Sequence, residues 1–559
     1  MAELVHQRSD GSITSSQLAG VMAIATTVLI AVPLVGWPSV VRLPAVLVPA
    51  LVLGVAVQRP WQWNQTSWER LDAWIPSNRT LLWGTLGLTL LLSWIVFTRF
   101  QSGGINGGDF TVYYDRPCVQ TLRGRPLLVE TADFPKFSHM SAIGHHAYWS
   151  LFPLCGLYAF GASPLWLLAV SVIAVVAGAV YIVRIVLALG GGGLLAVTSG
   201  LAFALNDNTA RALNFGFHPE VLYAWCIPWL LHSGLQKNRY SFIAAALACV
   251  SVKEDAILPL VAASIALGLH RFRSMNAVDR LIFLAIPPLV GLANLAVFWG
   301  YIAPRLTPDG ELVYAAFWAN YGSPPIRALA GMVTAPERVF VDILTSGFFR
   351  LVILPTLFLS FIGWRWMLAM APMVAVYAAA SDLQLRGFGI YYAIVLVPFL
   401  TVAGSVGAME LSMRVMTNSC CTRIVAAALI LAGALLVGSG NGGYSLQPWR
   451  SEIAAVPEVL THLAAERVVL VQSSLYPHTG YDARIQLLTP SALHDPRHAG
   501  AAVLVAPAMG TYPFEVDDIL RISQLPTIHS IHGLMAVRIP PQPGALDHTT
   551  PSSPGSEVR

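Results

Sequence analysis

Charged residues are scarce in this sequence. Of its 559 residues only 11% are Asp, Glu, Lys or Arg, whereas soluble domains carry about 25%. Hydrophobic residues make up 55% of the chain, and its mean hydropathy is +0.63. This composition excludes an ordinary soluble protein and predicts one that crosses a membrane many times.

Several other signals are missing. The net charge of +4 is spread along the chain without a basic run, which argues against a nucleic-acid partner. The six cysteines form no CxxC pair and show no metal-ligand spacing, so neither a disulfide framework nor a zinc site is indicated. The N-terminus has no cleavable signal pattern, and residues 17–37 are long enough to remain as a first span. We find no convincing internal repeat.

Long apolar runs follow one another between residues 17 and 440. We count about thirteen that are long enough, or nearly long enough, to span a bilayer. They lie at 17–37, 39–57, 79–98, 163–189, 192–206, 219–234, 241–252, 256–269, 280–302, 348–363, 367–380, 390–408 and 424–440. The pattern predicts an all-α polytopic protein of the plasma membrane.

Basic residues in the short loops set the expected orientation. They fall into four loops, which contain Lys237 and Arg239; Arg271, Arg273 and Arg280; Arg365; and Arg414 and Arg423. With a cytoplasmic N-terminus and thirteen crossings, all four loops lie in the cytoplasm. The same parity places the loops 99–162 and 303–347, and everything after residue 440, on the outer side.

The composition changes after residue 440. Residues 449–466 are amphipathic at helical spacing, and four strand-like runs follow, RVVLVQSSL, RIQLLTP, AAVLVAPAM and GLMAVRIP. We therefore expect a small extracytoplasmic α/β domain at 441–540 and a disordered tail at 541–559. A transmembrane core at 79–440 precedes this domain, and residues 1–78 form an additional N-terminal hairpin and cytoplasmic loop.

The stretch NFGFHPE, residues 214–220, opens a long apolar segment. Pro219 suits the first position of a helix, His218 then stands at the cap, and Glu220 falls in the first turn. One interpretation is that both side chains only cap the helix. The other is that a histidine and a carboxylate mark a site where membrane meets water.

A second polar group interrupts the apolar stretch 241–270. As one helix this stretch would be about 45 Å long, too long for a hydrocarbon core of about 30 Å. Lys253, Glu254 and Asp255 lie in its middle, where each charge would cost about 2.5–3.5 kcal/mol. We therefore expect a tight hairpin of two short helices. Its tip is either a polar turn in which Lys253 pairs with a carboxylate, or part of a site.

The first long outer loop begins GGINGGDFTVYYDRP. Its glycines permit unusual backbone angles, and a helix over DFTVYYDRPCVQTL places Asp109 and its aromatic neighbours near the membrane surface. Asp109 is either a turn former or a functional carboxylate. His145 and His146 further along are either ligands or bases, or they mark an amphipathic helix in the interface.

A third outer region, LRGFGIYYAIVLVPFL, contains Arg386, Tyr391 and Tyr392. Arg386 is either a phosphate ligand or an arginine that snorkels to the interface. The two tyrosines suit an ordinary aromatic belt. In the last domain, YPH at 476–478 follows the first strand, where α/β domains place ligands, although a plain turn explains it equally.

Six motifs together resemble a known family. They are GGDF, HHAYWSLFPLCGLYAFG, FGFHPE, VKED, GIYYAIVLVPFL and VQSSLYPHTGYDARI, in this order over about residues 95–510. The family is one of prokaryotic predicted membrane proteins of unknown function. It is similar to the GT-C superfamily of glycosyltransferases, which use lipid phosphates.

The resemblance implies a GT-C-like core, a polyprenyl-phosphate-linked sugar as donor and a site between the membrane and the outer loops. Asp109 matches the carboxylate that acts there as catalytic base or metal ligand, and Lys253 or Arg386 would bind phosphate. The matched motifs add further candidates. His218 and Glu220 are candidates for catalysis; His146, Glu254, Asp255 and Tyr392 for substrate binding; and Asp109, His145, His146 and Glu220 for a divalent ion such as Mg or Mn.

Together with the expected topology, the resemblance thus implies a membrane glycosyltransferase that moves a sugar from a lipid-phosphate donor to an acceptor on the outer face. Two alternatives belong to other classes: a transporter or flippase of a lipid-linked or hydrophobic solute, and a non-catalytic scaffold. A transporter needs ionisable residues along the depth of its bundle and often shows repeats. Polar motifs that gather at one face favour the enzyme.

Overall fold

The computed structural model describes residues 78–130, 140–307, 313–415, 426–431, 433–434, 444 and 446–540. The spans expected at 17–37 and 39–57, most of the one at 424–440, and the tail at 541–559 lie outside the described residues. The chain divides into two compact units. We call Met1–Thr98, Ile143–Leu157 and Leu165–Leu446 the membrane unit, and Arg99–Ala142, Tyr158–Pro164 and Gln447–Arg559 the sheet unit.

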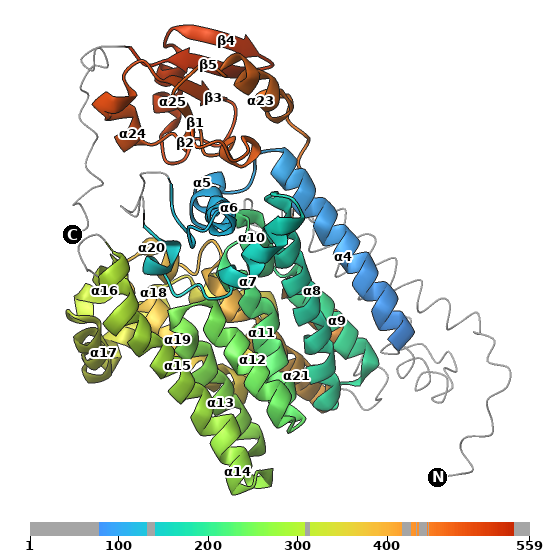
Figure 1. Ribbon diagram of the computed structural model, residues 1–559. Coiled ribbons are helices and arrows are strands. Elements are labelled where there is room, and N and C mark those ends of the chain that lie inside the picture. The colour runs from blue at the N-terminus through green and yellow to red at the C-terminus, as the bar shows by residue number, and fades with distance from the viewer. Residues whose placement is uncertain are drawn as a thin grey trace, which may run out of the picture. The chain divides into compact units, whose positions relative to one another are not determined.

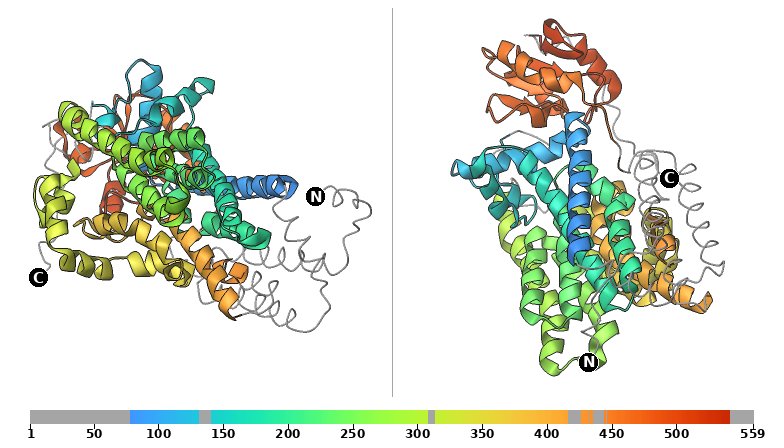
Figure 2. Two further views of the ribbon diagram at one scale, coloured as in Figure 1. Left: turned by 90° about the horizontal axis from the view of Figure 1, so that it is seen from below. Right: turned by 90° about the vertical axis from the view of Figure 1, so that its right-hand side faces the viewer.

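The membrane unit consists of helices that run side by side (Figure 1), and those drawn in green stay bundled in both views of Figure 2. They are α4 (Asn78–Gln101, up to Thr98), α7 (Leu151–Cys155), α8 (Leu165–Ala188), α9 (Gly192–Leu205), α10 (Asp207–Phe215), α11 (Tyr223–Leu235), α12 (Arg239–Val252), α13 (Ile257–Arg271), α14 (Ala277–Arg280), α15 (Ile286–Val297), α16 (Ala303–Leu306), α17 (Pro325–Thr334), α18 (Pro336–Thr345), α19 (Trp364–Ala378), α20 (Leu383–Arg386) and α21 (Val397–Val415). Two π-helical turns, Leu281–Ala285 and Phe298–Ile302, join α14, α15 and α16 into one helical stretch.

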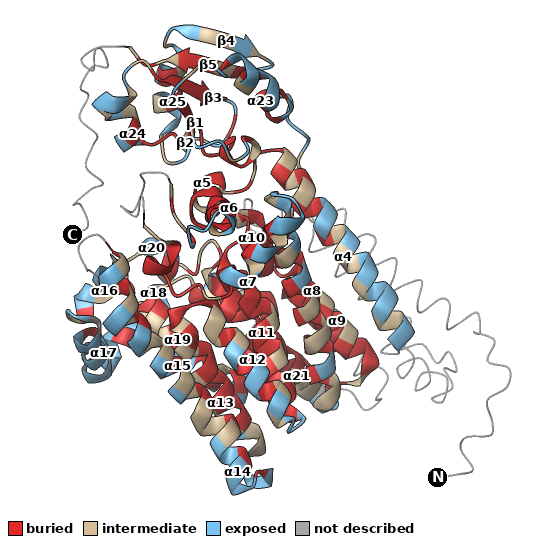
Figure 3. Cartoon of the chain, viewed as in Figure 1, coloured by how far each residue is buried: buried red, intermediate tan, exposed pale blue. Residues whose placement is uncertain are grey.

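Small residues let these helices pack closely. α8 packs against both α9 and α11. A Cβ atom at Gly178 of α8 would lie 2.0 Å from the carbonyl oxygen of Ala224 in α11, so only glycine fits there. Burial follows the same contacts, since α9 and α11 are mostly buried while α4 is largely exposed (Figure 3). The outward side chains of α4, such as Leu82 and Trp83, suit lipid tails rather than water.

Four helical stretches among the described residues are long and apolar enough to cross a membrane: Asn78–Gln101, Leu165–Ala188, Glu254–Ser274 and Ala277–Leu306. A bent pair, Pro336–Thr345 with Phe348–Thr356, makes a fifth if it is one span. The expected count of about thirteen is therefore not confirmed. Several expected spans do form helices at the expected places, but they are short. α12, for example, has 14 residues and is about 20 Å long, less than a hydrocarbon core of about 30 Å.

The hairpin expected at the second polar group is present. α12 ends at Val252, Lys253 is extended with φ −164° and ψ 162°, and α13 begins after a 3₁₀ turn at Glu254–Ala256. The opposite end of the hairpin is basic. There Arg239 Nη2 lies 2.8 Å from Asp279 Oδ1, and Lys237 Nζ donates to the carbonyl of Ser274 at 2.5 Å. Two of the basic loops thus meet at the end of the hairpin away from Lys253.

The sheet unit contains five strands in the order β2-β1-β3-β5-β4. They are β1 (Val469–Val471), β2 (Ile485–Leu487), β3 (Ala502–Val505), β4 (Thr527–Ile531) and β5 (Leu534–Arg538). β1 pairs in parallel with β2 and β3, whereas β5 is antiparallel to β3 and β4. The helices of this part are α23 (Ser451–His462), α24 (Pro490–His494) and α25 (Val516–Ser523). The expected helix and four strands are confirmed. β4 was not expected, because its sequence TIHSI is half-exposed and lacks a clear alternation.

The start of the first long outer loop also belongs to the sheet unit. It forms α5 (Gly107–Phe110), a π-helical turn at Thr111–Asp115 and α6 (Arg116–Leu122). The helix expected over DFTVYYDRPCVQTL is therefore confirmed. This segment packs with residues from the far end of the chain, a grouping that no local pattern indicates.

Candidate functional site

Two of the predicted polar motifs meet inside the membrane unit. Lys253 Nζ lies 2.7 Å from Glu220 Oε1, and both side chains are buried. His218 contacts the second oxygen of the same carboxylate through Nδ1. The side chain of His218 makes no capping hydrogen bond to the 3₁₀ turn that Pro219 begins. The simple capping interpretation of His218 is therefore wrong, because its ring binds Glu220 instead.

The histidine pair reaches the same region. His146 Nδ1 lies 2.7 Å from Glu254 Oε1, and the amide of Ala147 donates to Glu254 Oε2 at 3.0 Å. The Tyr314 hydroxyl contacts His145 Nε2, and its ring stacks on His146 with centroids 4.6 Å apart. His145 and His146 are 8% and 7% exposed and lie outside any helix. The alternative of an interfacial amphipathic helix is therefore wrong.

Tyrosines enclose the remaining members. Asp255 accepts hydrogen bonds from the Tyr223 hydroxyl at 3.0 Å and, more weakly, from the Tyr377 hydroxyl at 3.5 Å. The Tyr391 ring stacks on His218 at 3.7 Å, and its hydroxyl donates to Tyr392 at 3.5 Å. Tyr391 is 8% exposed, so it packs in the interior rather than in an aromatic belt.

We call His146, His218, Glu220, Lys253, Glu254 and Asp255 the charge cluster. It has three carboxylates and one lysine, so ionised carboxylates would outnumber the lysine charge. The ammonium group of Lys253 already contacts Glu220. An arriving phosphate would have to displace that carboxylate and would meet two more. The arrangement therefore favours Lys253 as an internal counter-ion over Lys253 as a phosphate ligand.

Arg386 lies elsewhere in the membrane unit. Its guanidinium pairs with Asp342 Oδ1 at 3.3 Å and donates to Thr345 Oγ1 at 2.6 Å, both on α18. Among the side chains that the structure describes, its hydrogen bonds thus go to α18 and not to the charge cluster. These contacts explain Arg386 without a phosphate or a snorkelling position.

The side chains proposed for a divalent ion do not come together as ligands. Within the described parts of the chain, no three His, Cys, Asp or Glu side chains are arranged to hold a metal. His145 and His146 contact Tyr314 and Glu254. Both oxygens of Glu220 are bonded to Lys253 and His218. Asp109 belongs to the other unit.

Asp109 sits in the first turn of α5, in the sheet unit. Asn106 caps this helix, and its side-chain amide donates to Asp109 Oδ2 at 3.0 Å. Gly107 and Gly108 have ordinary negative φ angles, so the expected role in unusual backbone angles is wrong for these two. They allow close approach instead. A Cβ at Gly107 would lie 2.0 Å from the carbonyl oxygen of Ser473, and the amide of Gly108 donates to Ser473 Oγ at 2.8 Å.

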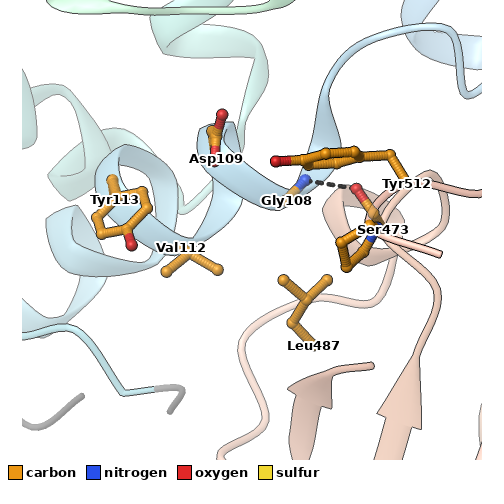
Figure 4. Close-up of a pocket in the computed structure, with 8 residues that line it drawn as sticks. Gly108, Asp109, Val112, Tyr113, Ser473, Leu487 and Tyr512 are labelled. Carbon is orange, nitrogen blue, oxygen red and sulfur yellow. Dashed lines mark hydrogen bonds between the residues drawn. The ribbon is translucent and has the colours of Figure 1, made fainter. Parts of the chain in front are cut away.

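This close approach borders a pocket with an empty volume of about 260 Å³ (Figure 4). Helical residues of the first outer loop form one wall and the ends of the strands form the other. The pocket is lined by Gly108, Asp109, Val112, Tyr113, Ser473, Leu487, Tyr512 and Pro513. Burial raises the pKa of Asp109 to about 6, although the hydrogen bond from Asn106 opposes the shift. The carboxylate is therefore ionised at neutral pH yet basic enough to accept a proton.

Asp115, a second carboxylate of the sheet unit, is held by hydrogen bonds from two tyrosines. Asp115 Oδ1 accepts hydrogen bonds from the hydroxyls of Tyr158 and Tyr481 at 2.6 and 2.8 Å. Burial raises its pKa to about 6 as well. Arg116 beside it donates to the carbonyls of Gly480 and Asp482. These bonds attach the start of the first outer loop to the segment that follows YPH.

Ser473, Leu487 and Tyr512 were not singled out from the sequence. Their position in the chain is the signal that could have identified them, because all three lie at or after the carboxyl ends of strands. YPH itself forms a 3₁₀ turn beside this edge, and Tyr476 and Pro477 are buried. Its histidine ring packs on Phe100 with centroids 4.2 Å apart. The plain-turn interpretation of YPH accounts for these contacts.

Comparison with known proteins gives one family and two structures. The model of the family described as "Predicted membrane protein (DUF2079)" matches residues 109–480. No curated protein matches the chain. The crystal structure of ArnT from Cupriavidus metallidurans bound to undecaprenyl phosphate is similar with a TM-score of 0.45 and 10% identity, covering 83% of this chain and 98% of that one. Its apo state gives a TM-score of 0.41 and 11% identity, covering 81% and 98%. Scores this low support no conclusion about activity.

Proposed function

The chain belongs to the family of predicted membrane proteins described as DUF2079, and we propose that it acts at a membrane. We further propose that its activity there is that of a glycosyltransferase. It moves a sugar from a lipid-phosphate donor to an acceptor hydroxyl on the outer face. The observation that carries this proposal is Asp109, a carboxylate with a pKa near 6 in the wall of a pocket that also contains aromatic rings. General bases are found with such pKa values.

The chemical step is a substitution at the anomeric carbon. The oxygen of the acceptor hydroxyl forms the new bond to this carbon. The bond from the carbon to the phosphate oxygen breaks, and the lipid phosphate leaves with the electron pair. The proton of the acceptor hydroxyl passes to Asp109, which the Asn106 amide holds by its Oδ2 oxygen. The step consumes and releases nothing else.

The charge cluster has a supporting role in this proposal. Its Lys253–Glu220 ion pair joins NFGFHPE to the tip of the α12–α13 hairpin, and its His146–Glu254 contact joins the histidine pair to the same tip. Breaking such a buried pair from one side costs about 3–5 kcal/mol, because a charge is left without its partner. We therefore assign His218, Glu220 and Lys253 to holding the outer ends of these helices in place.

The orientation is part of the same proposal. The tip at Lys253 and the basic loops at Lys237 and Arg273 lie at opposite ends of one helical hairpin. Basic loops remain on the cytoplasmic side of a membrane. We therefore place the charge cluster at the outer side and the loops of Lys237 and Arg273 in the cytoplasm.

One observation favours the transporter alternative. The charge cluster is a set of buried ionisable side chains within a helical bundle, and such groups often mark ion or proton pathways. Against a pathway, the described members lie together at one end of α12 and α13 and are not spread along them. The enzyme therefore remains the first choice.

The test uses a cell from which the gene for this chain has been deleted. The deletion strain is complemented with the wild-type chain, with Asp109→Asn, or with the control Asp495→Asn, whose carboxylate pairs with Arg497 on the surface of the sheet unit. Mass spectrometry then measures the glycolipids and glycans of the cell envelope. We expect the wild type and the control to restore a glycosylated product that Asp109→Asn does not restore. Full restoration by Asp109→Asn at equal expression would exclude the proposed base.

A further inference from the structure

The helices α13 and α19 pack against each other in the membrane unit, and their two ends differ in chemistry. At one end the Tyr377 hydroxyl of α19 donates to Asp255, which lies just before α13 in the charge cluster. At the other end the His270 ring of α13 and the Trp366 ring of α19 have centroids 4.6 Å apart. The helices are therefore antiparallel, and this His–Trp contact lies at the end away from Lys253.

Each ring of this contact has an arginine beside it in the chain. Arg271 follows His270 at the end of α13, and Arg365 comes just before the tryptophan at the start of α19. The positive charges of both guanidinium groups act on the His270 ring, so both arginines lie near the same contact. Among the residues that the structure describes, neither arginine is paired with a carboxylate. Arg365 is exposed and Arg271 is half-buried, so a ligand can reach both.

Two buried ring nitrogens of the same contact also lack a partner. His270 Nε2 and Trp366 Nε1 have no hydrogen-bond partner in the described parts of the chain, and Trp366 is fully buried. Leaving a buried polar atom unpaired is unfavourable, and a bound ion or water accounts for many such atoms in proteins. The polar groups of the described chain therefore do not complete this place by themselves. We call His270, Arg271, Arg365 and Trp366 the basic seam.

Apolar side chains next to the basic seam are exposed. Trp364 and Leu368 lie one turn apart on α19 and are 54% and 50% exposed. Leu269, the residue before the histidine of the seam, is 37% exposed. The Arg365 guanidinium carbon lies 5.6 Å from the centroid of the Trp364 ring. The cationic groups are therefore adjacent to a surface that suits acyl chains, as at the boundary between headgroups and tails.

These features select the chemistry of the ligand. A free anion would use the two guanidinium groups and leave the apolar surface without a partner. A phospholipid uses both, because its phosphate accepts hydrogen bonds from arginine while its tails cover Trp364 and Leu368. Basic pockets between membrane helices bind lipid headgroups on the cytoplasmic side. A choline headgroup carries a cation that two arginines repel, so a headgroup with net negative charge fits better.

We propose that the basic seam binds an anionic phospholipid, with its phosphate on Arg271 and Arg365 and its acyl chains along Trp364 and Leu368. The orientation proposed above puts this lipid in the cytoplasmic leaflet, on the side opposite to the transfer of the sugar. The bound phosphate compensates two positive charges and joins the end of α13 to the start of α19. Binding at the seam does not depend on the proposed glycosyltransferase activity.

The experiment measures lipid binding to the purified full-length chain in detergent. Native mass spectrometry counts the lipids that the chain retains during titration with phosphatidylglycerol or with phosphatidylcholine of the same acyl chains. Inorganic phosphate is added as a competitor, to separate a lipid site from a site for the free anion. The variants are Arg271→Gln and Arg365→Gln. The matched control is Arg273→Gln, which removes the same charge from an exposed position two residues after Arg271.

We expect the wild type to bind phosphatidylglycerol about 10-fold more tightly than phosphatidylcholine. Arg271→Gln and Arg365→Gln should each weaken the binding of phosphatidylglycerol about 10-fold, the size of one lost hydrogen bond to a charged group. Arg273→Gln should bind like the wild type, since general attraction between basic loops and anionic lipid does not single out two arginines. Inorganic phosphate should not displace the lipid.

Three results would overturn the proposal. They are equal binding of the two lipids by the wild type, an Arg365→Gln variant that binds no more weakly than Arg273→Gln, and displacement of the lipid by inorganic phosphate. Because Arg365 is exposed, its variant tests the seam even if Arg271→Gln does not fold. The complementation test of Asp109 is independent of all three results, so failure of this inference can be told apart from failure of the proposed function.

Discussion

Lys253 Nζ lies 2.7 Å from Glu220 Oε1, and this one contact joins two motifs that are 33 positions apart in the chain. Neither motif is remarkable for its local structure, since one begins a 3₁₀ turn and the other interrupts two helices. Their meeting explains how Lys253 is tolerated at a buried position, because a carboxylate compensates its charge.

Removing the carboxylate of this pair should lower the stability of the membrane unit. Glu220→Gln removes the carboxylate that contacts the buried Lys253 ammonium, and we expect a loss of about 3–5 kcal/mol of stability. Thermal unfolding of the purified chain, followed by circular dichroism, measures it. Adding Lys253→Met to Glu220→Gln should recover part of the loss, because the ammonium that lost its contacting carboxylate is then removed too.

The matched control for Glu220→Gln is Asp518→Asn. Asp518 pairs with Arg521 at 2.5 Å on the surface, where both side chains are exposed. Exposed pairs contribute about 0–1 kcal/mol, so this variant should unfold like the wild type. Equal behaviour of Glu220→Gln and Asp518→Asn would show that the buried pair contributes no more than a surface pair.

Asp109 should make the folded chain sensitive to pH. The carboxyl group ionises near 3.8 in the unfolded chain and at about 6 in the folded one. Between these values the folded state binds more protons, so its stability falls as pH rises, and the full cost is present above pH 6. Asp109→Asn removes this cost. We expect it to raise the melting temperature at pH 7.5, by an amount corresponding to about 1–3 kcal/mol, and to leave it unchanged near pH 3.5.

Catalysis should show the opposite pH dependence. Only the ionised carboxylate accepts a proton, so transfer should increase as pH rises through about 6 and then level off. The measurement is the pH profile of kcat/KM with the substrates that the complementation experiment identifies. A profile that is flat between pH 5 and 7 would contradict Asp109 as the base.

Gly107 should tolerate no side chain. A Cβ atom there would lie 2.0 Å from the Ser473 carbonyl oxygen and 2.7 Å from Pro477, so Gly107→Ala must push α5 away from the strand ends. We expect a loss of about 1–3 kcal/mol of stability. Gly84→Ala in α4 is the control, because a Cβ there meets nothing within 4 Å. Limited proteolysis of both variants compares them, and equal resistance would argue against the close contact.

The orientation can be tested with single cysteines. Arg497 and Arg273 are both exposed, one on the sheet unit and the other in a basic loop. A maleimide that cannot cross membranes should label Arg497→Cys in intact cells, and Arg273→Cys only after the membrane is opened. The wild-type chain reports any labelling of the native cysteines. Labelling of Arg273→Cys in intact cells would reverse the proposed orientation.

The sequence was informative wherever local pattern decides structure. The break at Lys253 followed from the cost of charge in a bilayer, and the strands β1, β2, β3 and β5 followed from apolar runs between turn residues. The predicted number of spans was not confirmed, for a related reason. Hydropathy locates apolar runs, but it does not tell a crossing helix from a shorter helix buried among others, such as α11 with 13 residues.

Contacts between distant residues set the limit for the candidate sites. Periodicity carries no information on which charges will pair. The ion pair between Arg386 and Asp342 could therefore not be predicted from the sequence. The same holds for Gly107 and Gly108. Their motif can be seen in the sequence, but the reason for it is the close packing against Ser473, which lies 365 positions after Gly108. That Tyr512 and Leu487 line the same pocket can be recognised only when the strand order is known.

The hydrogen bond from Gly108 to Ser473 also constrains how the protein is made. A ribosome releases residues 99–142 long before it reaches β1, so the early segment lacks the sheet that it packs against until hundreds of further residues have been synthesised. During synthesis its glycine-rich turn and the tyrosines after it therefore lack their packing partners in the sheet. A chain that stops before the sheet should therefore expose this segment to proteases and quality control, even with every membrane helix in place.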